Sequence, residues 1–199
     1  MKIINKKIIV SIIAFTMLIS CSSRDELLVK PDDKKKSAQS IVVLPVINKT
    51  ADNKASQLLR IKLLEQLYFK GYAKIPFETI DKKLEKYYSP AGKNESGVIA
   101  PQVVKEMTGA DGALYCKLLE AKTSRTVFYA TVTVSISCEL RNTIAGEVLW
   151  TASHQATTRN FHPTKSGLEI KTRESFEQLI EEVVNKIMET MPEGPKIQG

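Results

Sequence analysis

Side chains that could do catalytic chemistry are few and scattered along this chain of 199 residues. The two histidines, His154 and His162, have a spacing that fits neither a helical His-x-x-x-His pair nor a zinc site. Asp81 and Glu85 stand beside lysines, four apart, as is typical of a solvated helix face. No nucleophile elbow, phosphate loop or dinucleotide fingerprint is present. The sequence therefore predicts a protein that is not an enzyme and holds no cofactor and no metal.

Covalent chemistry of another kind is predicted at Cys21. Three lysines near the start precede an almost wholly apolar run, Ile8–Ile19. A membrane-spanning helix needs about 20 residues, so this run has the length of a signal-peptide core instead. The following Leu-Ile-Ser-Cys resembles the lipobox of bacterial lipoproteins, in which the signal is removed before an acylated cysteine. We therefore expect a signal peptide over residues 1–20 and lipid attachment at Cys21; a buried helix with an incidental cysteine is the alternative.

The residues after Cys21 predict where the protein resides. Ser22 stands where an Asp retains lipoproteins in the inner membrane of many bacteria, so we expect the cell envelope, at the periplasmic face of the outer membrane. Residues 22–40 are rich in charged residues, have only Leu27-Leu28-Val29 as an apolar run and cannot form a core, which predicts a flexible tether. Without the signal peptide the net charge is +4, too small and too scattered to favour nucleic acid as a partner.

Residues 41–192 predict a single α/β domain, and residues 193–199 a short tail. Helices covering a mixed sheet are expected, because apolar strand-like runs alternate with amphipathic segments. The first two strands would form a parallel crossover and the last strands an antiparallel meander. The fold class is therefore α/β (α+β), with about five strands and three to four helices. The expected strands are Ile41–Pro45, Tyr72–Phe77, Ala113–Leu119, Thr131–Leu140 and Glu147–Ala152; the expected helices end at Lys70, follow Thr79, follow Pro101 and cover Phe176–Met191; and Phe161–Arg173 is expected to be an irregular loop.

One predicted strand has a clear candidate for a binding surface. Its apolar residues, Val132 to Leu140 at every second position, alternate with hydroxyl side chains, so one face is buried and the other is wet or faces a partner. Solvent exposure and a partner strand or sheet both remain open for that second face. Its candidate partner-facing residues are Thr131, Thr133, Ser135 and Ser137.

The remaining residues of interest favour structural roles. Cys116 and Cys138 lie in predicted strands, and two buried free thiols are favoured over a bridge, which needs Cα atoms within about 7 Å. Asp111 lies between a helix end and a strand start, so it is expected to serve a turn rather than a phosphate cradle. Met188 and Met191 are expected to belong to the core.

Several short stretches stand out together by their order and spacing: Ile41–Pro45 with Asn48, Lys70-Gly71-Tyr72, Ile75-Pro76, Thr108–Tyr115 and Gly146–Trp150. Together they resemble bacterial lipoproteins of unassigned function that are related to the CsgG, LpoB and TolB amino-terminal domains. The chain departs from CsgG because it has no room for the two long membrane-spanning hairpins that build its pore. It also has Ala145-Gly146 where relatives often have Thr-Gly, and Ala121–Thr126 lacks the expected aromatics.

The resemblance implies a domain that binds other proteins in the envelope. We therefore expect a lipid-anchored, non-catalytic accessory or scaffold lipoprotein in an outer-membrane secretion or cell-wall assembly. Its expected contacts are the membrane, through the lipid, and either envelope proteins, a CsgG-like lipoprotein among them, or further copies of itself. The alternative is a module that binds a small ligand or peptidoglycan, indicated by the mild positive charge and the long predicted loop Phe161–Arg173.

Overall fold

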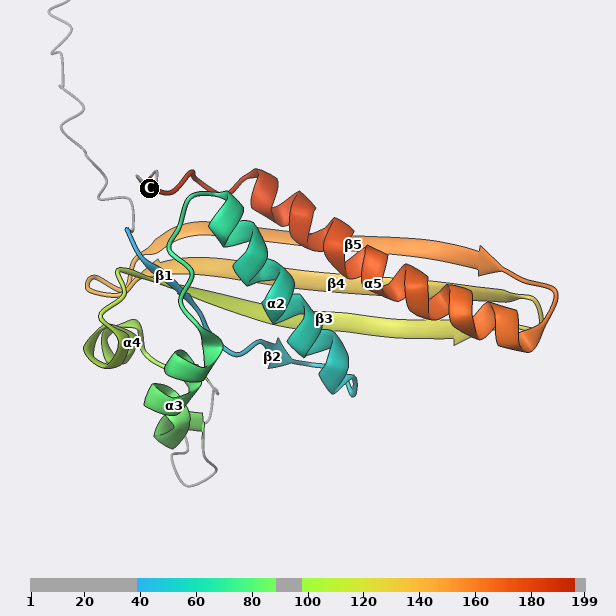
Figure 1. Ribbon diagram of the computed structural model, residues 1–199, viewed down its shortest axis with the longest axis horizontal. Coiled ribbons are helices and arrows are strands. Elements are labelled where there is room, and N and C mark those ends of the chain that lie inside the picture. The colour runs from blue at the N-terminus through green and yellow to red at the C-terminus, as the bar shows by residue number, and fades with distance from the viewer. Residues whose placement is uncertain (1–38, 89–97, 196–199) are drawn as a thin grey trace, which may run out of the picture. The chain divides into compact units, whose positions relative to one another are not determined.

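The computed structural model describes residues 39–88 and 98–195, within a compact unit that covers Lys36–Gly199. The predicted signal peptide, Cys21 and nearly all of the predicted tether lie outside the described residues. The described part folds as a five-stranded open sheet with parallel and antiparallel pairing and four helices (Figure 1). The predicted mixed α/β (α+β) fold is thus confirmed.

Three long antiparallel strands dominate the sheet, and two short strands pair in parallel with the first of them. Each long strand has 14 residues and therefore spans roughly 45 Å. The turn between the last two strands contains Gly146, whose φ of 74° suits glycine. The strands are β1 (Ile41–Val43), β2 (Ile47–Asn48), β3 (Gly112–Arg125), β4 (Tyr129–Asn142) and β5 (Val148–Phe161), in the order β1-β3-β4-β5 with β2 also beside β3.

The helices cover the two faces of the sheet unequally. Helices α2 (Asn53–Phe69) and α5 (Lys165–Glu189) lie across one face and bury its apolar side chains in the main core. Helices α3 (Phe77–Tyr88) and α4 (Pro101–Thr108) pack on the other face only around β1 and the start of β3, where they form a smaller core. Figure 1 shows both small helices gathered at that end.

Local signals set the helix ends. The Asp52 side chain accepts a hydrogen bond from the Ala55 N–H at 3.0 Å, which caps α2, and Gly71 follows the helix with a φ of 87°. Pro101 opens α4, as predicted, and Gly109 closes it in the left-handed conformation. Helix α3 begins at Phe77, so Thr79 lies in its first turn and the predicted cap at Thr79 is wrong.

The predicted strand Tyr72–Phe77 is wrong, and so is the crossover built on it. The Tyr72 side chain is buried and its hydroxyl donates to the Pro192 carbonyl at 3.1 Å, so this segment joins the end of α2 to the C-terminal segment. Pro76 has no N–H to donate to a ladder, and Phe77 already belongs to α3. The parallel partner of β1 is β3 instead, with Val42 opposite Ala113.

The Arg60 side chain of α2 forms hydrogen bonds with a backbone carbonyl of β1. Its guanidinium donates to the Val43 carbonyl at 3.0 and 3.2 Å and to both Asp81 carboxylate oxygens at 2.7 and 2.8 Å, and it stacks over the Phe77 ring. A strand paired with β1 on this side would need the Val43 carbonyl as a hydrogen-bond acceptor. The Arg60 side chain binds it instead, at the position where the strand Tyr72–Phe77 was expected. Asp81 is therefore held in an ion pair rather than belonging only to a solvated face.

The predicted loop Phe161–Arg173 is also wrong. Strand β5 runs to Phe161, and α5 begins at Lys165 after Thr164, whose hydroxyl accepts from the Gly167 N–H at 3.3 Å. The predicted closing helix is confirmed from Phe176 to Glu189, where α5 ends two residues earlier than predicted. Met188 and Met191 are both buried in the core, as predicted. The loop that favoured a peptidoglycan-binding module is therefore absent.

Cys116 and Cys138 form a disulfide, contrary to the favoured prediction of free thiols. They are directly opposite each other in the register of β3 and β4, and their Cα atoms are 4.2 Å apart. That separation is typical of the closely spaced pairs of an antiparallel ladder. Both residues are buried on the α2 and α5 side, so the bond links the two central strands inside the main core.

Removing the disulfide is expected to destabilise the domain. In the chain-entropy model, a cross-link that closes a loop of this length stabilises a protein by about 3 kcal/mol. The double variant Cys116→Ala with Cys138→Ala should lose about that free energy of unfolding in urea titrations. The oxidised wild type should lose a similar amount when reductant is added, whereas the double variant should not respond. Equal denaturation midpoints for oxidised wild type and variant would contradict the structural role.

Candidate interaction surface

The polar face of β4 is the surface singled out by the sequence, and the structure places all four of its predicted residues on one side of the sheet. Thr131, Thr133, Ser135 and Ser137 are each half-exposed, while the intervening residues are buried against α2 and α5. The predicted alternation of buried and polar residues is thus confirmed along the whole strand. Whether this face meets a partner stays a prediction.

The neighbouring strands extend this surface on both sides. Lys122 of β3 lies opposite Thr133, and Thr157 of β5 lies opposite Thr133 on the other side, with the two threonine hydroxyls 3.1 Å apart. We call this three-strand surface the open face. It also includes Lys117, Glu120 and Ser124 of β3 and Ser153, Gln155 and Arg159 of β5.

The contributions of β5 to the open face were missed by the sequence analysis. The strand was expected to stop at Ala152, because the segment from Ser153 to Phe161 has few apolar residues. Its core side carries small or polar residues, Ala156 and Asn160 among them, which α5 buries. The signal that existed was the run of β-branched Thr157 and Thr158, which favours a strand.

The helices α3 and α4 mark one limit of the open face. Tyr115 of β3 is buried beneath them, and its hydroxyl donates to the Ile99 carbonyl at 2.7 Å. Burial raises the pKa of the Tyr115 phenol to about 12. Beyond Tyr115, among the residues that the structure describes, no helix packs on this side of the long strands (Figure 1).

Strand β5 is an edge of the sheet over its whole length. It contains no proline and no glycine, and Arg159 is its one residue with a permanent charge. Natural edge strands are usually blunted by prolines, lysines or bulges, or covered by another element. An edge of this kind can accept a further strand from a second chain.

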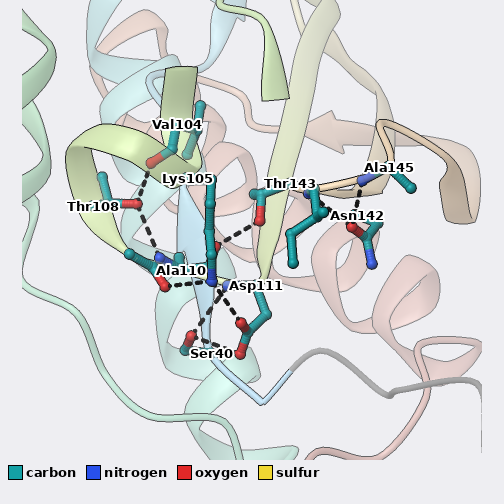
Figure 2. Close-up of polar contacts among 11 residues, drawn as sticks. Ser40, Val104, Lys105, Thr108, Ala110, Asp111, Asn142, Thr143 and Ala145 are labelled. Atoms are coloured by element: carbon teal, nitrogen blue, oxygen red, sulfur yellow. Dashed lines mark hydrogen bonds and ion pairs between the residues drawn. The ribbon is translucent and has the colours of Figure 1, made fainter. Parts of the chain in front are cut away.

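A polar node fixes the covered end of the sheet (Figure 2). The Asp111 carboxylate accepts from the Lys105 ammonium at 2.9 Å and from the Ser40 hydroxyl at 3.2 Å. The hydrogen bond from Lys105 lowers the pKa of the Asp111 carboxyl. The Thr143 N–H donates to the Asp111 carbonyl, and the Thr143 hydroxyl donates to the Ala110 carbonyl at 2.6 Å. Asp111 therefore serves the turn, as predicted, and joins the starts of β1 and β3 to the β4–β5 turn.

The histidines do not share a site. His154 is half-buried on the α5 side of β5, whereas His162 lies in the β5–α5 turn with its Nδ1 3.1 Å from the Thr164 amide nitrogen. Over the described ranges, no group of three histidine, cysteine, aspartate or glutamate side chains is arranged to hold a metal ion. The same residues include no helix with the length and hydrophobicity needed to cross a bilayer.

Comparison with known proteins identifies similar chains. A family model described as "Putative lipoprotein GNA1162-like" matches residues 32–197. The crystal structure of lipoprotein GNA1162 from Neisseria meningitidis is 24% identical, with a TM-score of 0.54, over 76% of this chain and 99% of that chain. A PelC dodecamer from Paraburkholderia phytofirmans is 14% identical, with a TM-score of 0.51, over 76% of this chain and 87% of that chain.

The C-terminal domain of LpoB from Escherichia coli also matches, with 14% identity and a TM-score of 0.42 over 60% of this chain and 84% of that chain. No curated protein matches. The two structures with TM-scores above 0.5 share the fold of this chain. The expected relation to the CsgG and TolB domains stays a prediction.

The buried phenol of Tyr115 is expected to make the domain sensitive to alkaline pH. Its pKa is raised in the folded state, so the neutral form stabilises the fold fully below pH 10, and this contribution disappears as the pH rises to about 12. Between these values the wild type should lose about 2 kcal/mol more free energy of unfolding than Tyr115→Phe. Parallel urea titrations test this, with Tyr87→Phe as the control. Equal pH profiles for all three proteins would contradict the burial of an un-ionised phenol.

Proposed function

Because this chain belongs to the GNA1162-like lipoprotein family, we propose that it is a lipid-anchored, non-catalytic accessory protein of the cell envelope that works by binding other proteins. In this proposal residues 1–20 are a removed signal peptide and Cys21 carries the lipid. The domain then projects from the periplasmic face of the outer membrane and serves a secretion or cell-wall assembly.

The open face carries the proposal. Hydroxyl, amide and charged side chains of three strands form a broad surface that the described helices leave uncovered beyond Tyr115, and a buried disulfide links β3 and β4 beneath it. A rigid, preorganised surface loses little entropy when a partner binds. The spread of polar groups, without a deep concave pocket among the described residues, favours a protein partner over a small ligand.

A second copy of the chain is the other candidate partner. The unprotected β5 edge supports it, since two such edges can pair through their backbones. The likeness to a PelC structure that is a dodecamer supports self-assembly as well. An envelope partner on the open face and a second copy on the β5 edge are compatible, because these surfaces are different.

Blocking acylation is expected to release the protein from the membrane. Replacing Cys21 by Ser removes the thiol that the lipid needs, so the fraction in washed membranes should fall at least about tenfold. Intact-mass measurement of the wild type should show two changes, loss of residues 1–20 and addition of acyl chains. A wild-type mass that retains Met1 and carries no lipid would contradict the proposed anchor.

Large cations on the open face are expected to displace the partner. Thr133→Arg with Ser135→Arg should reduce the partner recovered by crosslinking and pull-down from membranes at least about tenfold, because both side chains protrude into the proposed contact. Gln178→Arg with Asn185→Arg, on the exposed side of α5, adds the same charge and is the matched control, which should retain the partner. Equal recovery with all three proteins would contradict the open face as the binding surface. Recovery of this chain alone would favour self-assembly.

A further inference from the structure

Exposed large apolar side chains gather at the end of the sheet opposite the polar node. Val127 and Phe128 form the turn between β3 and β4 and are 77% and 49% exposed, and Tyr129 and Phe161 beside them are 39% and 51% exposed. We call these four residues the sheet tip. In Figure 1 this end of the long strands lies far from α3 and α4. On a monomeric soluble protein, large exposed apolar patches often mark binding sites for a protein or a membrane.

The tip is a built structure rather than a frayed end. The Thr126 N–H donates to the Tyr129 carbonyl at 2.8 Å, and the His162 N–H donates to the Phe128 carbonyl at 3.0 Å, so the hairpin turn is hydrogen-bonded to the end of β5. The rings of Tyr129 and Phe161 pack with their centroids 5.1 Å apart. The backbone therefore holds the apolar side chains outward.

Positive charges surround the tip. The Arg159 guanidinium lies 4.2 Å from the centre of the Tyr129 ring. Arg125 ends β3 and, with Arg173, lines a shallow surface pocket beside exposed Ile170. Lys122 and Lys165 are exposed nearby, at the end of β3 and the start of α5. Glu169, 3.8 Å from Arg125, is the one carboxylate that pairs with these cations in the described residues.

An apolar apex with a basic collar complements the surface of an anionic bilayer. Phenylalanine, valine and tyrosine side chains partition into the boundary between headgroups and acyl chains, while arginine and lysine bind the lipid phosphates. A convex hairpin turn suits insertion between headgroups. A protein partner for the same apex would need a matching pocket.

The proposed anchor permits this contact. Residue Ser40, where the chain joins the sheet, binds Asp111 and Gly112 at the start of β3, and the tip lies at the other end, roughly 45 Å away. The 19 residues between Cys21 and Ile41 reach roughly 60 Å when taut. A chain held by Cys21 therefore has enough length to bring the tip to the same bilayer.

We propose that the sheet tip is a second membrane-contact site, in which Val127, Phe128 and Tyr129 insert among anionic phospholipid headgroups while Arg125 and Arg159 bind their phosphates. This second site rests on the proposed function only in assuming that the protein is held at a membrane. In this proposal the lipid at Cys21 and the sheet tip hold the protein to the bilayer at two points.

The test uses the chain from position 21 onward with Cys21→Ser, which contains the whole described domain and has no acyl group. Its partition onto phosphatidylcholine vesicles with about 30% phosphatidylglycerol should exceed that onto pure phosphatidylcholine and should weaken with salt. Phe128→Asp should reduce this partition at least about tenfold. Ile144→Asp is the matched control with little effect, since Ile144 is 67% exposed in the turn at the other end of β4 and the charge change is identical.

A fluorescence measurement reports the tip directly. In Phe128→Trp, vesicles should shift the emission to shorter wavelength, and brominated lipid should quench it. Trp150, the one native tryptophan, is 9% exposed in the core and gives a constant background. Equal vesicle partition of Phe128→Asp and Ile144→Asp, or an unchanged emission, would overturn the inference. If Phe128→Asp instead removed a protein from the crosslinked pull-down, the tip would be a protein-binding surface. These vesicle results do not depend on Cys21 acylation, so either proposal can fail alone.

Discussion

The two-residue period of β4 is the constraint on which the rest of the structure depends. Because successive side chains of a strand point to opposite faces, its apolar residues enter the main core while its threonines and serines form the open face. A register shift of one residue would exchange the two faces. The disulfide between Cys116 and Cys138 holds β3 and β4 in the observed register, and α5 buries the apolar side of β4 and β5.

The two ends of the long strands differ in whether other elements cover them and satisfy their polar groups. At one end, α3, α4 and the Asp111 node cover the sheet and satisfy its polar groups. At the other end, the turn through Val127 and Phe128 exposes apolar side chains, and Asn160 beneath α5 has a buried amide nitrogen without a hydrogen-bond partner in the described structure. The first end is built as a stable support, and the second carries features that fit contact with a surface outside the domain.

The elements that could be predicted from the sequence are those in which local pattern and tertiary environment agree. The alternation from Val132 to Leu140, the apolar stripe of α2 and the Pro101 and Gly109 boundaries of α4 all correspond to the structure. The segment Tyr72–Phe77 has a strand-like composition. However, the buried Tyr72 hydroxyl donates to the Pro192 carbonyl, and the Arg60 guanidinium donates to the Val43 carbonyl that a paired strand would need. Neither long-range contact leaves a local signal.

The open face was only partly predictable for similar reasons. Its β4 residues follow from periodicity, whereas those of β5 required knowing that α5 begins at Lys165 and buries a stretch of β5 that contains the polar residue Asn160. The disulfide depended on the register of two strands, which no pattern within either strand determines. Tertiary packing thus supplied what propensity could not.

The central claim is that a lipid-held domain presents the open face to another protein. Photo-crosslinking in intact cells, from an unnatural amino acid at Ser135, tests it most directly. The account predicts a specific adduct with an envelope protein from Ser135, and none from the same probe at Gln178 on α5. Adduct patterns that are the same at both positions, or no adduct from Ser135, would contradict it.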